Sequence, residues 1–218
     1  MATSTVENYI KAIYLECREI GDEMLPIGRL AQSLSVVPGT ATTMVKSLCE
    51  AGLVDYEPRV GTKLTKQGQA LALHVLRRHR LVELFLVEIL KMDWSEIHEE
   101  AEHLEHVISD RVLERIDDLL GHPQYDPHGD PIPSHSGHFQ ERNLQSLVNC
   151  DAGTETKVAR IVDQEAIFLQ FAEKNGLVPG NSVQILNRDD AANAIEVKTA
   201  TGKTLTLGKQ AAVKIEVE

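Results

Sequence analysis

Residues 26–65 read PIGRLAQSLSVVPGTATTMVKSLCEAGLVDYEPRVGTKLT, and this stretch decides the fold of the N-terminal part. Pro26 is typical of the first turn of a helix, where its missing N–H costs nothing. The Pro-Gly pair at 38–39 separates that helix from a second, amphipathic one, which ends near Gly52, a residue suited to a C-cap. Two short β-branched runs then flank a turn at residues 59–61. This order predicts a winged helix-turn-helix; the alternative is a small α+β domain whose helix pair serves only for packing.

Apolar residues at helical spacing predict further helices on both sides of this stretch. One covers residues 5–20, and a long one runs from about 66 to 91. Two more are expected over 95–108 and from 109 to about 121, and the Pro-, Gly- and His-rich residues 122–139 form a loop.

The periodicity changes from helical to alternating after residue 156. Five short β-branched runs, with a helical piece between the first two, predict a small five-stranded barrel. The fold class is therefore mainly α with a small β part. We expect a DNA-binding domain at 1–65, a helical domain at 66–140, a linker at 141–153 and the β domain at 154–218.

Composition is that of a soluble globular protein, with 42% hydrophobic and 25% charged residues. No apolar run is long enough to span a bilayer, and the N-terminus lacks a signal-peptide pattern. The three cysteines are far apart and have no CxxC spacing. We therefore expect a cytoplasmic protein without a disulfide framework, without a membrane partner and without a small organic substrate.

The net charge of −11 is unevenly distributed. Residues 1–80 carry 10 Lys and Arg against 8 Asp and Glu, whereas residues 81–150 carry 4 against 15. The first interpretation is that the acidic residues form a solvated helix face that has no role in binding. The alternative is that the N-terminal third contacts DNA and the acidic middle binds cations, since phosphate affinity depends on the local patch.

The helix expected at 95–108 carries the chemistry. His98, Glu102, Glu105 and His106 share a wedge beside its apolar stripe, which consists of Ile97, Ala101, Leu104 and Ile108. On the preceding helix, His79 and Glu83 are four residues apart and share a face. Imidazoles and carboxylates converging from two packed helices suit a divalent metal, although each residue alone is more often a bystander.

Two alternatives concern other histidines and catalysis. The loop histidines His122, His128, His135 and His138 could also bind metal, but a Pro-rich loop offers little preorganisation. A metallohydrolase would need an open metal position and a general base, and the HExxH signature of the zincins is absent because the position of its second histidine holds Glu102. No nucleophile elbow or phosphate-cradling glycine loop occurs either, so we expect no enzyme.

The chain resembles the diphtheria-toxin-repressor family of iron- and manganese-dependent regulators along essentially its whole length. The resemblance is carried by VENYIKAIY (6–14), PGTATTMVKSLCEAGLV (38–54), RRHRLVELFL (77–86), HEEAEHLEHVIS (98–109) and DPHGDPIP (126–133). It implies a winged helix, a helical dimerisation and metal domain, and an SH3-like domain of the ferrous-transport type.

The family also implies two metal sites. The primary site would combine Asn8 of the first helix with Glu102, Glu105 and His106. The ancillary site would use His79, Glu83 and His98, with Glu165, Asp163 or Gln164 as a ligand from the third domain.

Two departures from the family pattern affect the metal. Iron-type members have Cys where this chain has Glu102, and manganese-type members usually have Asp at Asn8, some with Glu at Lys11. An oxygen and nitrogen donor set favours Mn²⁺ or Fe²⁺, with Co²⁺, Ni²⁺ and Zn²⁺ plausible in vitro. Asn8 and Lys11 argue against a two-metal cluster.

The resemblance predicts a homodimer that binds double-stranded palindromic operator DNA when metal is present. Bases and backbone would be contacted by Pro38, Gly39, Thr40, Thr42 and Thr43, and phosphates by Arg29, Lys46, Arg59 and Lys63. Two rivals stay open: a winged-helix repressor whose metal site is only structural, and a cytosolic metal-binding or transport-accessory protein.

Overall fold

The computed structural model describes residues 3–21, 23–140 and 142–218. The chain divides into two compact units. The first contains residues 1–79, 104–108 and 133–138, and the second contains residues 80–103, 109–132 and 139–218. Within the described ranges, no helix is both long enough and apolar enough to cross a membrane.

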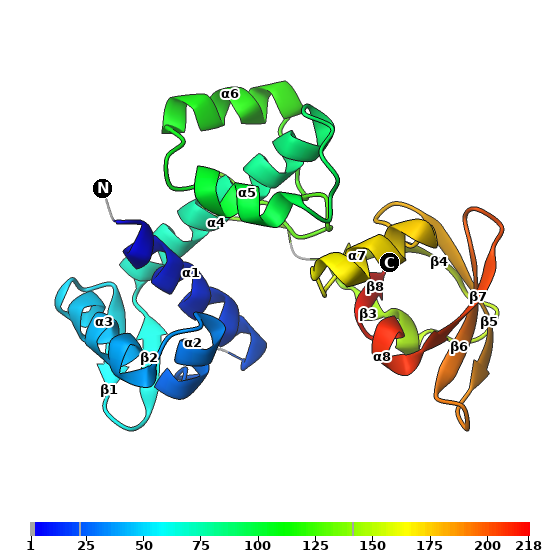
Figure 1. Cartoon of the computed structure of the whole chain (residues 1–218), viewed down its shortest axis with the longest axis horizontal. Coiled ribbons are helices and arrows are strands. Elements are labelled where there is room, and N and C mark those ends of the chain that lie inside the picture. The colour runs from blue at the N-terminus through cyan, green and yellow to red at the C-terminus, as the bar shows by residue number, and fades with distance from the viewer. Residues whose placement is uncertain (1–2, 22, 141) are drawn as a thin grey trace. The chain divides into compact units, whose positions relative to one another are not determined.

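The first unit contains three helices, then a β-hairpin, and then most of a long fourth helix (Figure 1). Their bounds are α1 Ser4–Glu19, α2 Ile27–Ser33, α3 Pro38–Glu50, β1 Val54–Glu57, β2 Gly61–Leu64 and α4 Lys66–Glu88. Ile10, Ile13, Leu30 and Leu48 are completely or almost completely buried in its core. This is the order expected from the sequence, and it confirms the winged helix.

The hairpin of the wing is fixed to the chain before α2. Leu25 and Thr62 exchange backbone N–H···O bonds of 2.8 and 2.9 Å, which adds a third strand segment to the pair β1–β2. Arg59 in the turn has φ 70°, a left-handed conformation. A Cβ on Gly61 would lie 2.4 Å from the carbonyl oxygen of Leu25, so only glycine allows this approach.

The helical part of the second unit contains the rest of α4, then α5 Ile97–Leu104 and α6 Asp110–Leu120. Ser109 caps α6, and Gly121 ends it in the left-handed conformation at φ 75°. Helix α5 ends four residues earlier than expected, which leaves Glu105 and His106 in a turn. Leu104 is 37% exposed, whereas Ile97 and Ala101 of the same apolar stripe are completely buried.

The C-terminal part of the second unit is a six-stranded antiparallel sheet in the order β3-β8-β4-β5-β6-β7 (Figure 1). The bounds are β3 Gln145–Ser146, β4 Glu155–Ile161, β5 Ser182–Asp189, β6 Ala194–Thr199, β7 Thr204–Gly208 and β8 Ile215–Val217, with helices α7 Ala166–Lys174 and α8 Lys209–Ala212 and the 3₁₀ turn Leu147–Asn149.

The sixth strand lies in the segment that we expected to be a linker. β3 pairs with β8, and Leu147 and Cys150 are buried in the core of the sheet. A strand of two residues is too short to show alternation, so the sequence pattern did not reveal it.

Candidate metal centre

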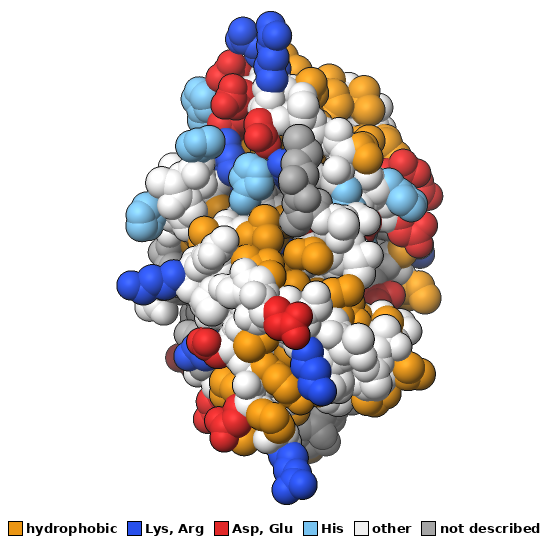
Figure 2. Space-filling model, turned by 90° about the vertical axis from the view of Figure 1, so that its left-hand side faces the viewer, with side chains coloured by type: hydrophobic (Ala, Val, Ile, Leu, Met, Phe, Trp, Pro, Cys, Tyr) orange, Lys and Arg blue, Asp and Glu red, His pale blue; other side chains and the backbone are white. Residues whose placement is uncertain are grey.

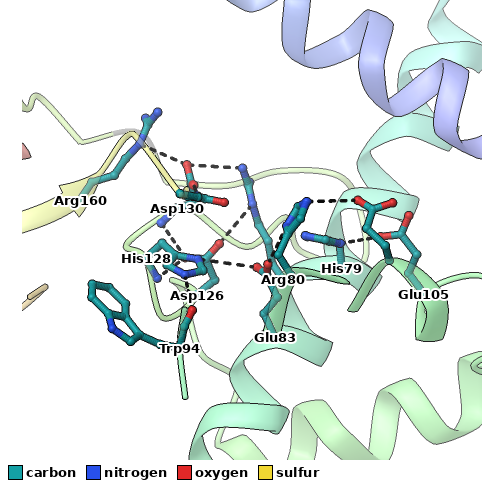
Figure 3. Close-up of polar contacts among 12 residues, drawn as sticks. His79, Arg80, Glu83, Trp94, Glu105, Asp126, His128, Asp130 and Arg160 are labelled. Carbon is teal, nitrogen blue, oxygen red and sulfur yellow. Dashed lines mark hydrogen bonds and ion pairs between the residues drawn. The ribbon is translucent and has the colours of Figure 1, made fainter. Parts of the chain in front are cut away.

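The carboxylate of Glu105 lies at the centre of a buried polar cluster in the first unit. Its Oε1 is 2.7 Å from Nζ of Lys11, and its Oε2 is 2.7 Å from Nδ1 of His79 (the His79 contact is drawn in Figure 3). The side chain of Glu105 is completely buried. Helix α1, helix α4 and the turn after α5 each supply one of these three groups.

Charge at this cluster is set by the partners of Glu105. Burial alone would raise the pKa of its carboxyl, but the hydrogen bonds and charges of His79 and Lys11 outweigh burial and lower it. Because a carboxylate only accepts, the proton of the His79 contact lies on Nδ1 of the imidazole. When the ring of His79 is neutral, its lone pair lies on Nε2.

A second contact joins α1 to the same turn. Nδ1 of His106 donates to Oε2 of Glu7 at 2.6 Å, and Oε1 of Glu7 is 3.6 Å from Nη1 of Arg78. When the ring of His106 is neutral, its lone pair lies on the other nitrogen, Nε2. That nitrogen is buried, lies 3.4 Å from Oε1 of Glu105 and has no hydrogen-bond partner among the described residues.

Asn8 provides another buried oxygen without a partner. Its Oδ1 accepts no hydrogen bond from any residue that the structure describes. Buried polar atoms are almost always paired, so a buried amide oxygen without a donor is an acceptor that a cation could satisfy. Imidazole nitrogen with amide and carboxylate oxygens is a donor set that suits Mn²⁺ or Fe²⁺, so the residues present fit a divalent metal.

Glu7 was missed by the sequence reasoning, which selected only Asn8 from α1. The available signal was the i, i+4 pair Glu7 and Lys11, two charged residues that project from the same face of α1 as the buried Tyr14. In the structure both are buried, one against His106 and the other against Glu105.

A second group of metal-ligand side chains lies in the second unit. Glu83, Asp126 and His128 are all buried, and each offers a ligand atom within 4.8 Å of the others. Figure 3 shows the three turned toward one another. The ring of His128 stacks on Trp94 with centroids 5.4 Å apart, and its Nε2 is 3.1 Å from the backbone oxygen of Trp94. Its Nδ1 is buried without a hydrogen-bond partner within the described part of the chain.

The loop that carries this group is ordered by its own backbone. Oδ1 of Asp126 accepts from the N–H groups of His128 and Asp130, both at 2.9 Å. Burial raises the pKa of Asp126 well above its ordinary value, and the neighbouring charges of Asp130 and Glu83 add to the rise despite Arg80. The sequence analysis expected little preorganisation of the loop that carries His128. Hydrogen bonds from side chain to backbone order this loop, and such bonds leave no periodic signal in the sequence.

The remaining expected ligands occupy different environments. Nδ1 of His98 is 3.4 Å from Glu83, and its Nε2 is 3.8 Å from Glu102, although the ring is 53% exposed. Glu165 is the exposed N-cap of α7 and belongs to no metal-ligand group of the described residues. Of its neighbours, Gln164 donates to Asp130 and Asp163 accepts from Lys214.

The residues expected to contact DNA bases are at the start of α3. Pro38, Gly39, Thr40 and Thr43 are exposed, and Thr42 is partly exposed. The hydroxyls of Thr42 and Thr43 donate to the carbonyl oxygens of Pro38 and Gly39 at 2.8 and 3.0 Å. Their donors are therefore in use, which leaves hydroxyl lone pairs and methyl groups facing outward.

The residues expected to contact phosphates lie in different surroundings. Lys46, Arg59 and Lys63 are exposed on α3, the turn of the wing and β2. Arg29 forms ion pairs with Glu16 and Glu19 of α1, which a phosphate contact would have to replace. On the face drawn in Figure 2, Lys and Arg side chains do not form one broad basic patch.

Family models match three consecutive parts of the chain. Residues 1–62 match the N-terminal DNA-binding domain of the iron-dependent repressors, and residues 65–134 match their metal-binding and dimerisation domain. Residues 145–218 match the FeoA domain.

Individual proteins are similar over almost the whole chain. The diphtheria toxin repressor of Corynebacterium glutamicum is 30% identical over 91% of this chain and 97% of its own. The iron-dependent repressor IdeR of Mycobacterium tuberculosis is 29% identical over 97% and 96%.

Solved structures of manganese-activated relatives have the same fold. A manganese-dependent transcriptional repressor in complex with manganese is 38% identical, with a TM-score of 0.86 and coverage of 98% of this chain and 99% of the other. ScaR with bound Zn²⁺ is 33% identical, with a TM-score of 0.78 and 98% coverage of both chains.

Proposed function

The chain belongs to the diphtheria-toxin-repressor family of metal-dependent transcriptional repressors, and on this premise we propose that it is a homodimer that binds a palindromic operator when Mn²⁺ or Fe²⁺ is bound. It would act in the cytoplasm on genes of metal uptake. Its relatives are repressors and not enzymes, and we propose no catalytic activity for this chain.

The observation that carries the proposal is the contact between α1 and the turn after α5. Glu7 and Lys11 of α1 reach His106 and Glu105, and α1 also carries Asn8, whose buried Oδ1 has no hydrogen-bond partner among the described residues. A ligand that joins these groups would fix the orientation of α1, and with it the winged helix.

We assign Asn8, Glu102, Glu105 and His106 to the primary site, with Glu7 as an additional carboxylate beside His106. His79, Glu83 and His98 would form the ancillary site, and Asp126 and His128 are further donors around Glu83. Glu165 has the weakest support because it is exposed. When bound, the metal supplies positive charge and directional bonds to oxygen and nitrogen.

The DNA side of the proposal uses α3 and the wing. Two copies of α3 in a dimer would reach successive major grooves, with Thr40 and Thr43 toward the bases and Lys46, Arg59 and Lys63 toward phosphates. Threonines offer few bidentate base contacts, so shape readout would supply part of the specificity. Metal and DNA would favour the same orientation of the winged helix, so the binding of each would strengthen the binding of the other.

The test is binding of the full chain to a fragment of its own promoter. The fragment is titrated with Mn²⁺, Fe²⁺, Co²⁺ or Zn²⁺ against a chelated control, using wild type, Glu102→Ala and the matched variant Glu99→Ala. We expect binding only with metal, lost in Glu102→Ala and kept in Glu99→Ala, an exposed residue of the same helix.

Other outcomes select the rivals. Binding that ignores the chelator, or that survives in Glu102→Ala, would reduce the metal centre to a structural feature. No binding at low salt with any metal would instead favour a cytosolic metal-handling protein.

A further inference from the structure

Lys11 is a buried lysine within the proposed metal centre. It lies on α1, is 8% exposed, and places Nζ 2.7 Å from Oε1 of Glu105. Burying an ammonium is costly unless a carboxylate compensates it, and Glu105 is itself completely buried. The contact therefore belongs to the core of the first unit, unlike the exposed ion pair between Lys91 and Glu88.

Both oxygens of Glu105 have partners within the chain. Lys11 takes Oε1, and His79 takes Oε2 at 2.7 Å. A divalent ion bound to Glu105 would meet the positive charge of Lys11 at close range, where a low dielectric strengthens repulsion. The ammonium of Lys11 is on a flexible four-carbon stem, so it can move away from Glu105 when a divalent ion binds. The carboxylate of Glu105 is buried and stays in place as the ligand.

We propose that Lys11 is a tethered competitor of the metal: its ammonium holds Oε1 of Glu105 in the metal-free protein and leaves when a divalent ion binds there. This inference rests on the proposed metal centre. Lys11 thereby stabilises the metal-free state and raises the metal concentration at which the protein responds. Since a ligand shifts an equilibrium only by its difference in affinity for the two states, removing Lys11 favours the metal-bound state.

The test compares Mn²⁺ affinity and metal-free stability in the full chain without DNA. Free Mn²⁺ is measured by its EPR signal during a titration, and thermal unfolding is followed in the presence of chelator. For Lys11→Met we expect Mn²⁺ to bind at least about tenfold more tightly, and the Tm in chelator to fall while the Tm with saturating Mn²⁺ stays near that of wild type. Lys11→Gln repeats the test with a polar neutral side chain if the methionine variant does not fold.

Two controls isolate the contact from general charge effects. Lys11→Arg keeps a cation beside Glu105 and should resemble wild type. Lys66→Met removes an exposed lysine of the same unit and should leave Mn²⁺ affinity unchanged. Equal or weaker Mn²⁺ binding by Lys11→Met overturns the competition, because it means that Lys11 is indifferent or supports the metal. A wild type that binds no Mn²⁺ overturns the metal centre itself.

Discussion

At the scale of single residues, Glu105 contacts side chains from two helices and from its own turn. It holds Lys11 and His79 at 2.7 Å each and lies 3.4 Å from Nε2 of His106. None of these contacts follows from the helical periodicity of residues 95–108. That periodicity places Glu105 beside Glu102, but it contains no information about the position of α1. The residue types were predictable from the sequence, whereas their partners depend on how three segments pack.

Glu105→Gln should weaken the packing of α1 against the turn after α5 at neutral pH. It leaves the Lys11 ammonium buried without a counter-charge, and breaking a buried pair costs about 3–5 kcal/mol. Hydrogen exchange of α1 amides in metal-free protein measures the opening free energy. Unchanged protection of α1 would show that the pair contributes nothing to docking.

The same pair makes the docking of α1 dependent on pH. The folded pKa of Glu105 is lowered, so its contribution is complete above the unfolded pKa and is lost as pH falls through the folded pKa. The protection difference between wild type and Glu105→Gln should therefore shrink in acid, below the ordinary range of a carboxyl. A constant difference from neutral to acid pH would contradict the ionic origin.

At the scale of elements, the wing depends on a close backbone approach. Gly61→Ala should destabilise the first unit by about 1–3 kcal/mol, because its Cβ would lie 2.4 Å from the oxygen of Leu25. Gly28→Ala on α2 is the matched control: its Cβ meets no atom within 4 Å, and alanine suits a helix better than glycine. Thermal unfolding of both variants checks this, and equal Tm values would disprove the steric argument.

Helix α3 should contribute to DNA binding through charge as well as shape. Lys46→Ala should weaken binding to all DNA sequences alike and lower the salt dependence, log Kobs against log[salt], by about 0.9. Binding titrations at several salt concentrations measure the slope, with Lys66→Ala as an exposed control on α4. A loss confined to operator sequences would instead make Lys46 a base-reading residue.

At the scale of the whole molecule, the proposed dimer needs an apolar surface, and α6 offers one. Val112 and Leu119 are seven residues apart and are 49% and 61% exposed, while Ile116 and Leu113, which neighbour this stripe on the helix, are buried. Exposed apolar residues at this spacing indicate a face that a partner covers.

Leu119→Asp should convert the protein to a monomer and weaken binding to a palindromic operator. Sedimentation velocity measures the association state. Val213→Asp, which changes another exposed apolar residue, at 52% exposure, is expected to stay dimeric. A dimeric Leu119→Asp protein would place the interface elsewhere.

The sequence alone was sufficient to predict the winged helix, the long helix, the change to a β domain and the residue types of the proposed metal centre. These follow from local signals: apolar periodicity, caps such as Gly121, and turn residues. Four contacts became visible only in the tertiary structure. They are the hydrogen bond between His106 and Glu7, the hydrogen bond from Lys11 to Glu105, the grouping of Asp126 and His128 with Glu83, and the pairing of β3 with β8. Those contacts join residues distant in sequence, and their energies depend on burial and on which charges meet, which no local pattern encodes.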